Sequence, residues 1–373
     1  MKIRSAVLDR SGDNPTPYAD NKPMRFAELE LDPPGPGEVL VRIEAAGLCH
    51  SDLSVVNGDR VRPMPMALGH EGTGIVEALG PGVDGLAEGD RVVLVFLPSC
   101  GRCVPCLSGE GYLCANGAAA NGKGELIGGG RRLHECGHEV HHHLGVSAFA
   151  NYAVVDQRST VKVDRDIPPE IAAVFGCAVL TGVGAVINSA RVMPGETAIV
   201  FGLGGVGLAA TMGALGSGAA KVIAVDMIDA KIALANELGA IAVKPDQLAE
   251  TIAAHLPAGG ADAVIETVGN ARVLAQAYAS ARRGGRIVTV GLPPPEQTFA
   301  LSPLSLVGDG KTLIGSYMGS AIPARDIPRY IGMWQAGKLP VEKLISSTHQ
   351  LEDLNAMMDA MHRGEAIRQI IRF

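Results

Sequence analysis

The sequence predicts an α/β protein with two domains, one rich in β-strands and one built on a doubly wound parallel sheet. At 373 residues the chain exceeds the roughly 250 to 300 residues at which a single core stops growing, so two domains are expected. Its first part holds short apolar runs broken by Gly and Pro, typical of an antiparallel, partly barrelled sheet. Farther along, apolar runs alternate with helical stretches, which indicates βαβ units and a parallel sheet.

The expected strands of the β-rich domain are 38–46, 74–79 and 91–96. The expected strands of the parallel sheet are 197–201, 222–225, 263–267 and 286–290, with helices at 206–215 and 230–238. Two amphipathic segments, 327–336 and 351–362, and a β-rich end, 367–373, follow. We expect this last stretch to rejoin the first domain, which gives one domain of residues 1–180 with 317–373 and a second of residues 181–316.

Composition and charge exclude several classes of partner. Hydrophobic residues make up 47% of the chain, yet its longest apolar runs are strand-length and fall short of the roughly 20 residues of a membrane span, so no membrane partner is expected. The net charge of −7 is spread over charges of both signs, which offers no basic stripe to nucleic acid. The start, Met1-Lys2-Ile3-Arg4, lacks the apolar region of an export signal. We therefore expect a cytoplasmic protein with reduced thiols.

Four of the seven cysteines, Cys100, Cys103, Cys106 and Cys114, form a C-x2-C-x2-C-x7-C run. Tetrahedral zinc takes four thiolates, and a short loop with two-residue gaps brings four sulfur atoms to one point, so the run predicts a structural zinc site. Disulfides are the alternative, but the number of cysteines is odd and the pairs are too close in sequence to join separate elements. Cys136 is left over as a free thiol.

A second set of metal-ligating residues, Cys49, His70 and Cys177, is spread along the chain. Two thiolates and one imidazole leave the fourth position of zinc open, which is the mark of a catalytic site where the metal lowers the pKa of an alcohol. Asp52, three residues after Cys49, is placed to orient His70. For His70 alone, a core histidine with satisfied hydrogen bonds is the alternative.

A glycine fingerprint for a dinucleotide follows the first expected strand of the parallel sheet. The residues Gly202, Gly204, Gly205, Val206 and Gly207 lie in a G-x-G-x-x-G pattern that opens a helix. Asp226 ends the next strand, where a carboxylate accepts the ribose hydroxyls of NAD and repels the extra phosphate of NADP. An ordinary glycine turn is the alternative.

Residues 115–148 carry too little periodicity for any element, so we expect a long surface loop there. The loop contains His134, His138, His141, His142 and His143. A third metal site made with Cys136 is the alternative to solvated or pocket-lining histidines, but the histidines lack the regular gaps of the four-cysteine run.

The sequence resembles the zinc-dependent medium-chain alcohol dehydrogenases over essentially its whole length, and is most similar to their long-loop branch of liver-type and class III, formaldehyde-oxidising enzymes. The motifs that carry the resemblance are Cys49-His50-Ser51-Asp52, Gly69-His70-Glu71, the four-cysteine run, residues 200–207, Val225-Asp226 and residues 364–368. The resemblance implies a GroES-like catalytic domain, a Rossmann domain, two zinc ions and NAD. It also implies a homodimer, with a tetramer as the alternative.

Roles for single residues follow from the same resemblance. Cys49, His70 and Cys177 would hold the catalytic zinc with Glu71 close by, Asp52 would brace His70, and Ser51 would take the proton of the alcohol. The cofactor would contact His50, Thr181, Val206, Asp226, Lys231, Val268 and Arg368. The substrate pocket would contain Arg60, Phe96, His143, Leu144, Leu292 and Tyr317.

Two positions depart from the family pattern. Ser54 stands where many relatives carry a histidine that passes the proton to solvent, and residues 58–62 lack the acidic pair of the glutathione-dependent enzymes. We therefore expect an NAD-dependent dehydrogenase for a primary medium-chain or aromatic alcohol, forming an aldehyde or ketone. The alternatives are a thiol-adduct-dependent formaldehyde dehydrogenase and, from another class, an inactive zinc-stabilised NAD-binding regulator.

Overall fold

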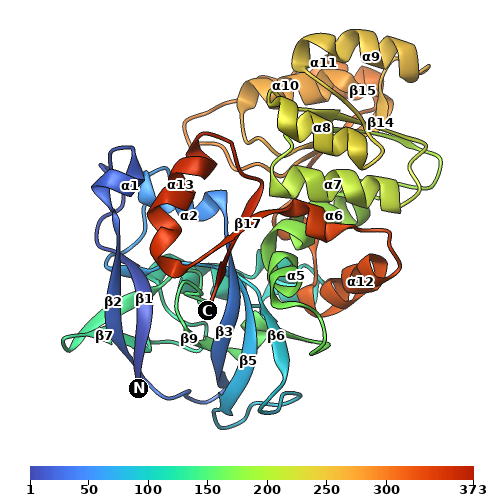
Figure 1. Ribbon diagram of the computed structural model, residues 1–373. Coiled ribbons are helices and arrows are strands. Elements are labelled where there is room, and N and C mark those ends of the chain that lie inside the picture. The colour runs from blue at the N-terminus through green and yellow to red at the C-terminus, as the bar shows by residue number, and fades with distance from the viewer. The chain divides into compact units, whose positions relative to one another are not determined.

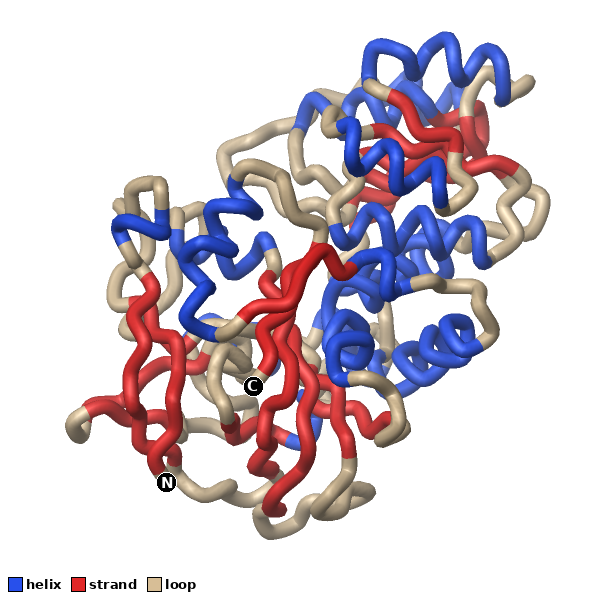
Figure 2. The backbone as a smooth tube through the Cα atoms, viewed as in Figure 1, coloured by secondary structure: helices blue, strands red, loops and turns tan.

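The computed structural model describes residues 1–373, and the chain divides into two compact units (Figure 1). The first unit consists of Met1–Cys177, Ile322–Pro328 and Ile345–Phe373. The second unit consists of Ala178–Ala321 and Arg329–Leu344. Strands dominate the first unit, whereas helices cover a small sheet in the second (Figure 2).

The first unit contains a small closed barrel and a larger mixed sheet. The barrel order is β1 (Lys2–Leu8), β2 (Met24–Leu31), β7 (Leu133–Glu135), β8 (His138–His142) and β4 (Met66–Ala67). The second sheet runs β10 (Thr160–Val163), β6 (Arg91–Leu94), β5 (Glu71–Leu79), β3 (Glu38–Leu48), β18 (Arg368–Arg372) and β17 (Ile345–His349), with β9 (Tyr152–Asp156) also pairing with β3. Fully buried side chains such as Tyr18 and Phe149 fill the core beside these sheets. This sheet brings β3, β5 and β18 together, and these are the strands that hold the site described below.

The C-terminal segment is joined to the first unit by hydrogen bonds as well as by packing. Asp359, on α13 (Leu354–His362), accepts the backbone N–H groups of Tyr18 and Ala19 through its two carboxylate oxygens at 2.7 and 2.8 Å. Strand β18 pairs antiparallel with β3, with Gln369 opposite Leu48. The other helices of this unit are α1 (Tyr18–Asn21), α2 (His50–Val56), α3 (Val104–Leu107), α4 (Ala115–Lys123), α5 (Pro169–Val174) and the start of α12 (Pro323–Gln335).

The second unit is a six-stranded parallel sheet with helices on it. The strand order is β13 (Ile241–Val243), β12 (Lys221–Val225), β11 (Thr197–Phe201), β14 (Ala261–Glu266), β15 (Ala281–Thr289) and β16 (Thr312–Gly315). Its helices include α6 (Leu180–Gly184), α7 (Gly205–Gly216), α8 (Asp229–Glu237), α9 (Leu248–His255), α10 (Ala271–Ser280) and α11 (Pro303–Asp309). Strand order reverses at β11, so the loops after β11 and β14 open at a topological switch point, where such sheets bind ligands.

One helical stretch, Pro169–Ala190, is long and apolar enough by composition to cross a membrane, although no apolar run of that length was expected from the sequence. Of its most apolar 18 residues, 83% are buried inside the protein, as is typical of a helix in a protein core. Two segments of the stretch, η3 (Phe175–Val179) and η4 (Ala185–Ala190), are π-helical. Single π-turns inside α-helices are frequent at functional sites.

The expectation of an irregular loop over residues 115–148 is wrong. The segment forms α4 and a β7–β8 hairpin, which turns at Cys136 and Gly137, both with positive φ. The two strands complete the barrel, with β7 on β2 and β8 on β4. Short strands rich in His and Glu do not alternate apolar and polar residues, so their pairing comes from the barrel rather than from local pattern.

Candidate active site

Cys49 lies at the point where a strand passes into a helix. It follows β3 and is the N-cap of α2, and Asp52 in the first turn accepts the Cys49 N–H through Oδ2 at 3.0 Å. This reciprocal cap satisfies the free N–H at the start of the helix and fixes the angle at which the chain enters it. The spacing of Cys49 and Asp52 therefore has a local structural cause as well as a chemical one.

His70 stands just before β5, and the residue before it fixes its position. Gly69 has φ +94°, and a Cβ there would lie 2.4 Å from the backbone nitrogen of Phe149. Only glycine fits this backbone conformation and this close approach. The chain can therefore turn His70 inward, where its side chain is 2% exposed.

Cys177 belongs to the π-helical segment η3, and the residue before it packs on β6. A Cβ at Gly176 would lie 2.3 Å from the carbonyl oxygen of Leu94, so the helix approaches this strand closely. The extra residue of a π-turn changes the direction of the side chains that follow it. Cys177 points into the same buried space as Cys49 and His70.

The three predicted ligands are brought together. The Sγ atoms of Cys49 and Cys177 are 3.9 Å apart, and their ligand atoms and those of His70 all lie within 4.8 Å of one another. Two sulfur atoms bound to one tetrahedral zinc at about 2.3 Å lie about 3.8 Å apart, so the donor set fits zinc. The neighbouring Cys177 thiol, and then the Arg368 guanidinium, lower the pKa of Cys49 well below its usual value, which favours the thiolate that a metal requires.

Asp52 orients His70 as the sequence predicts. Its Oδ1 lies 3.0 Å from Nδ1 of His70, and both side chains are buried. Burial disfavours the charge on Asp52, but His70 and then His143 outweigh it and hold its pKa at about 2. An ionised Asp52 keeps the proton of His70 on Nδ1 and leaves Nε2 free to bind a metal.

Glu71 and Arg368 form a buried ion pair beside the thiols. Arg368 Nε lies 3.4 Å from Glu71 Oε1, and its Nη1 donates to the Leu48 carbonyl oxygen at 2.8 Å. Burial raises the pKa of Glu71 to about 7 against the opposing charge of Arg368. The resemblance places Arg368 at the pyrophosphate; in the structure its side chain is 3% exposed and pairs with Glu71.

The four-cysteine run forms the second predicted site. Sγ distances are 4.0 Å for Cys100–Cys106, 3.4 Å for Cys103–Cys106 and 3.9 Å for Cys103–Cys114, which again fit a tetrahedral metal. Backbone N–H groups point at the sulfur atoms. The N–H of Arg102 makes the largest contribution to lowering the pKa of Cys100, which falls to about 6. A zinc ion would stabilise the thiolate form of all four cysteines, and it would close a loop that has little apolar core of its own.

The glycine fingerprint lies between β11 and α7, as predicted. Gly202 has φ +86°, and a Cβ at Gly207 would lie 1.7 Å from the Gly202 carbonyl oxygen. A Cβ at Gly204, in contrast, would meet no atom within 4 Å. Gly202 and Gly207 are thus needed to pack the loop on its helix, whereas Gly204 keeps the outer face of the loop open for a phosphate.

Four other predicted cofactor residues lie in the second unit together with this loop. Asp226 follows β12 and accepts the N–H groups of Leu203 at 2.6 Å and Ile228 at 3.0 Å. Lys231 lies on α8, the exposed Val268 follows β14, and Thr181 is buried on α6. Helix α6 packs closely on α7, since a Cβ at Gly182 would lie 2.2 Å from the Val206 carbonyl oxygen.

The remaining predicted site residues are distributed as follows. Ser51 is half-buried and His50 exposed in the first turn of α2, while Ser54 donates to the His50 carbonyl oxygen at 3.0 Å. The ring of Phe96 stands edge-on to His70, with centroids 5.7 Å apart. Leu144 and His143 are buried, Arg60 and Tyr317 are half-buried, and Leu292 is exposed.

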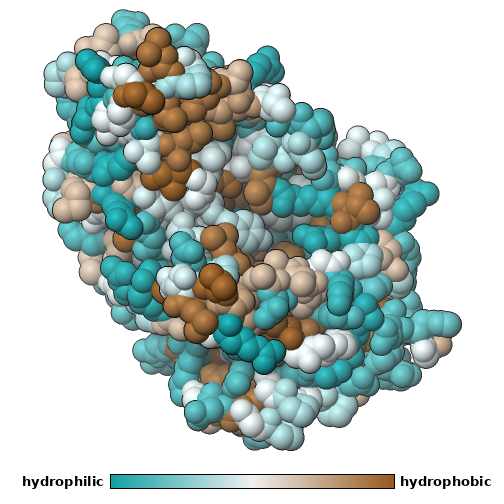
Figure 3. All heavy atoms as spheres, turned by 180° about the vertical axis from the view of Figure 1, so that it is seen from behind, coloured by the Kyte–Doolittle hydropathy of each residue, from teal (hydrophilic) through white to brown (hydrophobic).

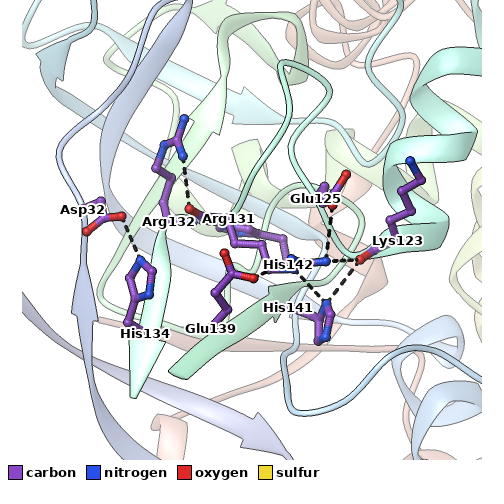
Figure 4. A network of polar contacts seen from close by, with 9 residues as sticks. All are labelled: Asp32, Lys123, Glu125, Arg131, Arg132, His134, Glu139, His141 and His142. Carbon is purple, nitrogen blue, oxygen red and sulfur yellow. Dashed lines mark hydrogen bonds and ion pairs between the residues drawn. The ribbon is translucent and has the colours of Figure 1, made fainter. Parts of the chain in front are cut away.

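The histidines of the β7–β8 hairpin find partners other than a shared metal (Figure 4). His134 pairs with Asp32 at 2.8 Å, His141 contacts Arg131 at 2.9 Å, and His142 Nε2 accepts the N–H of Arg132 at 3.1 Å. Burial, and then Arg132, lower the pKa of His142 to about 3. These contacts support the barrel and do not favour the third metal site that was the alternative for this segment.

Two residues that support the glycine loop and its neighbours were not identified from the sequence. Glu266, at the end of β14, accepts the N–H of Gly269 at 2.6 Å and the hydroxyl of Thr289 at 2.9 Å. The Thr267 hydroxyl donates to the carbonyl oxygens of Phe201 and Gly202 at 2.9 and 3.1 Å. The signal that could have identified them is a pair of polar residues at the end of an apolar strand. This strand, β14, lies beside β11, which leads into the glycine loop.

Thiolate and imidazole donors for an open metal position, together with a phosphate-binding glycine loop, define a zinc-dependent oxidoreductase that uses a dinucleotide. The chain matches the alcohol dehydrogenase GroES-like domain family over residues 35–165 and the zinc-binding dehydrogenase family over residues 205–335. It is 35% identical to the S-(hydroxymethyl)glutathione dehydrogenase of Synechocystis sp., with 100% of both chains covered. The chain belongs to the zinc-dependent medium-chain alcohol dehydrogenase family.

Solved structures agree with this assignment. The benzyl alcohol dehydrogenase of Acinetobacter calcoaceticus is 32% identical with a TM-score of 0.91, and covers 100% of this chain and 99% of its own. An alcohol dehydrogenase zinc-binding domain protein of Burkholderia ambifaria is 34% identical with a TM-score of 0.93, at the same coverage. The resemblance seen in the sequence motifs is thus confirmed, as are the β-rich GroES-like and Rossmann-type folds.

Proposed function

We propose that the protein reversibly oxidises an alcohol to an aldehyde or ketone with NAD, and that its main substrates are primary medium-chain or aromatic alcohols. The observation that carries this proposal is the buried Cys49, His70 and Cys177 set with Asp52 behind His70. Zinc in this set supplies a Lewis acid that lowers the pKa of an alcohol. An oxidation at this site needs a hydride acceptor, and the glycine loop of the second unit supplies a place for NAD.

The side chains around the metal ligands orient His70 and take the proton of the alcohol. Asp52 holds the His70 tautomer that leaves Nε2 free, and Ser51 takes the hydroxyl proton of the alcohol. Ser54 does not continue the relay as an imidazole would, because its own hydroxyl hydrogen is directed to His50 O. The proton therefore leaves from Ser51 by water or by the cofactor ribose.

A spectrophotometric screen of alcohols with NAD tests this function. Primary medium-chain and aromatic alcohols are expected to produce NADH, and the zinc content should be two per chain. A zinc-loaded protein that binds NAD but oxidises no alcohol would support the regulator instead.

A thiol-adduct-dependent formaldehyde dehydrogenase is the second candidate, and the 35% identity to S-(hydroxymethyl)glutathione dehydrogenase favours it. Residues 58–62, read Gly-Asp-Arg-Val-Arg, lack the acidic pair expected for a glutathione adduct. Formaldehyde oxidation with and without glutathione separates the two candidates. If turnover requires the thiol and exceeds that of every free alcohol, the second candidate replaces the first.

The cofactor preference should depend on the charge of Asp226. We expect Asp226→Gly and Asp226→Asn both to lower the preference for NAD over NADP by at least about tenfold, or about 1.4 kcal/mol, because both lose the charge that repels a phosphate. The glycine variant should lower the Tm more than the asparagine variant, because asparagine keeps one acceptor for the Leu203 N–H and loses only the one for the Ile228 N–H. Preference follows from kcat/KM with each cofactor, and a parent enzyme that prefers NADP would contradict this role.

Arg60 is proposed to favour substrates with an acidic tail. The quantity to compare is the kcat/KM for an ω-carboxy alcohol divided by the kcat/KM for its neutral analogue. This ratio should be about tenfold lower in Arg60→Leu than in the parent, because the variant loses a charge-assisted hydrogen bond. Arg363→Leu, which removes an exposed arginine paired with Glu365, is the matched control. An unchanged ratio in Arg60→Leu would show that Arg60 takes no part in selection.

A homodimer is proposed on the basis of the sheet edge in the second unit. Strand β16 is the last strand of that sheet and exposes Leu313, while α11 exposes Leu304 and Val307. Apolar side chains gather on part of the protein surface in Figure 3. An open strand edge beside apolar side chains suits pairing with a second copy about a two-fold axis. Light scattering distinguishes the dimer from a tetramer.

We also propose a cytoplasmic location. All seven cysteines are free thiols, and both metal sites need reduced sulfur. A reducing compartment maintains that state.

A further inference from the structure

His143 makes a contact that no sequence motif assigns to it. Its Nδ1 lies 3.2 Å from Oδ1 of Asp52, the same oxygen atom that lies 3.0 Å from Nδ1 of His70. The side chain of His143 is 2% exposed, and its Nδ1 makes no hydrogen bond of regular geometry, so the Asp52 oxygen at 3.2 Å is the polar atom that it faces. The two imidazole rings stand perpendicular, with centroids 5.3 Å apart. His143 is therefore directed at the carboxylate that orients a metal ligand, and not only at a substrate pocket.

The backbone holds His143 in this place at some cost. Leu144 and Ser147 have φ of +53° and +54°, and Gly145 between them has +69°. Left-handed backbone at a leucine and a serine is strained, and such strain persists only where surrounding contacts fix it. The contacts here are to the backbone N–H of His143, which lies 3.0 Å from Ser147 Oγ and 3.2 Å from the Ala67 carbonyl oxygen.

Asp52 is thus held from three directions. The N–H of Cys49 contacts Oδ2, whereas His70 and His143 both contact Oδ1. These three residues come from the start of α2, the approach to β5 and the turn after β8. Rotation of the carboxylate away from His70 would also break its buried contact with His143, and loss of a buried polar contact is costly.

We propose that His143 is a positioning residue of the catalytic zinc site, which acts by fixing the Asp52 carboxylate against His70. Partners behind a metal-bound histidine set its ring orientation and basicity, and their loss usually weakens metal binding by about 10- to 100-fold. The inference rests on zinc at Cys49, His70 and Cys177, and not on the identity of the alcohol.

Asp52, His70 and His143 could be taken for a metal site of their own, because their ligand atoms lie within 4.8 Å. The hydrogen bond between His70 and Asp52 favours positioning instead. It occupies Nδ1 of His70, which leaves Nε2 for a metal held together with Cys49 and Cys177.

Three substitutions of His143 test the proposal. His143→Asn places an amide N–H near the position of Nδ1, His143→Gln places it near Nε2, and His143→Phe keeps a ring without a donor. His142→Phe is the matched control, because this neighbouring buried histidine bonds Arg132 and does not reach Asp52.

The first measurement is the rate of zinc release to a chromogenic chelator. The phase of release that comes from the catalytic site is identified as the one that is missing in Cys177→Ala. We expect release from His143→Phe and His143→Gln to be at least about tenfold faster than from the parent. His143→Asn and His142→Phe should stay within about threefold of the parent. With cobalt in place of the catalytic zinc, only the Phe and Gln variants should show a shifted visible spectrum.

Three outcomes would overturn the proposal. In the first, His143→Phe releases zinc at the parental rate with an unchanged cobalt spectrum. In the second, all three variants release zinc equally fast and the metal-free proteins melt lower, which would assign His143 to packing alone. A parent with three zinc ions per chain that becomes two in His143→Phe would likewise replace positioning by direct binding.

Discussion

Replacing Cys177 with alanine should remove one of two zinc ions and essentially all alcohol oxidation, with little change in the fold. The site keeps only Cys49 and His70, too few ligands to retain a catalytic zinc at ordinary concentrations. We expect zinc to fall from two to one per chain and kcat to fall by at least about three orders of magnitude, the scale of a lost Lewis acid in this chemistry. Metal analysis, kcat and Tm are the three measurements.

Two further cysteine variants make the result specific. Cys103→Ala removes a ligand of the four-cysteine site, so it should also lose one zinc, but here the Tm should fall because a structural metal contributes folding energy. Cys136→Ala changes an exposed thiol at the β7–β8 turn and should leave zinc, activity and Tm unchanged. One zinc in the active parent, or full activity in Cys177→Ala, would refute the assignment of the catalytic site.

Substituting Gly207 with alanine should abolish useful NAD binding by distorting the loop itself. The new Cβ would lie 1.7 Å from the Gly202 carbonyl oxygen and 2.9 Å from the Thr267 hydroxyl, so the loop must move off α7. We expect the Kd for NAD to rise at least about 100-fold, or about 2.7 kcal/mol, and the Tm to fall. Calorimetric titration of NAD gives the first value and thermal melting the second.

Gly204→Ala is the informative comparison. A Cβ at this position meets no protein atom within 4 Å, so the Tm should stay at the parental value. NAD binding should still weaken, because the methyl group occupies the face that the pyrophosphate approaches. If Gly207→Ala bound NAD as the parent does, the loop would not be the dinucleotide site. A parental NAD affinity in Gly204→Ala would place the phosphate elsewhere on the loop.

The features that the sequence predicts well are those in which all the chemistry lies within a short segment. Four cysteines within one loop can meet only one another, and the glycine fingerprint needs only a strand, a turn and a helix in order. The catalytic ligands are distant in sequence, yet two cysteines and one histidine together favour an open zinc site, so they too were predicted.

The β7–β8 hairpin shows why other elements were missed. Its strands are three and five residues long and rich in His and Glu, so local propensity does not identify them. They become strands because β2 and β4 offer open edges in a closing barrel. The stretch Pro169–Ala190 is apolar along its whole length and contains two π-helical segments. A stretch that is buried on all sides has no alternation of apolar and polar residues from which its helix type could be predicted.

The sequence by itself determined the two zinc donor sets, the dinucleotide loop and the two kinds of fold, because each depends on residue type and local spacing. The tertiary structure alone decided that Arg368 pairs with Glu71 and that His143 reaches Asp52. In both pairs, one partner lies on a strand or turn that only sheet pairing brings to β3, β5 and α2. Buried charges must find partners wherever the fold places them, and no local pattern records which partner that is.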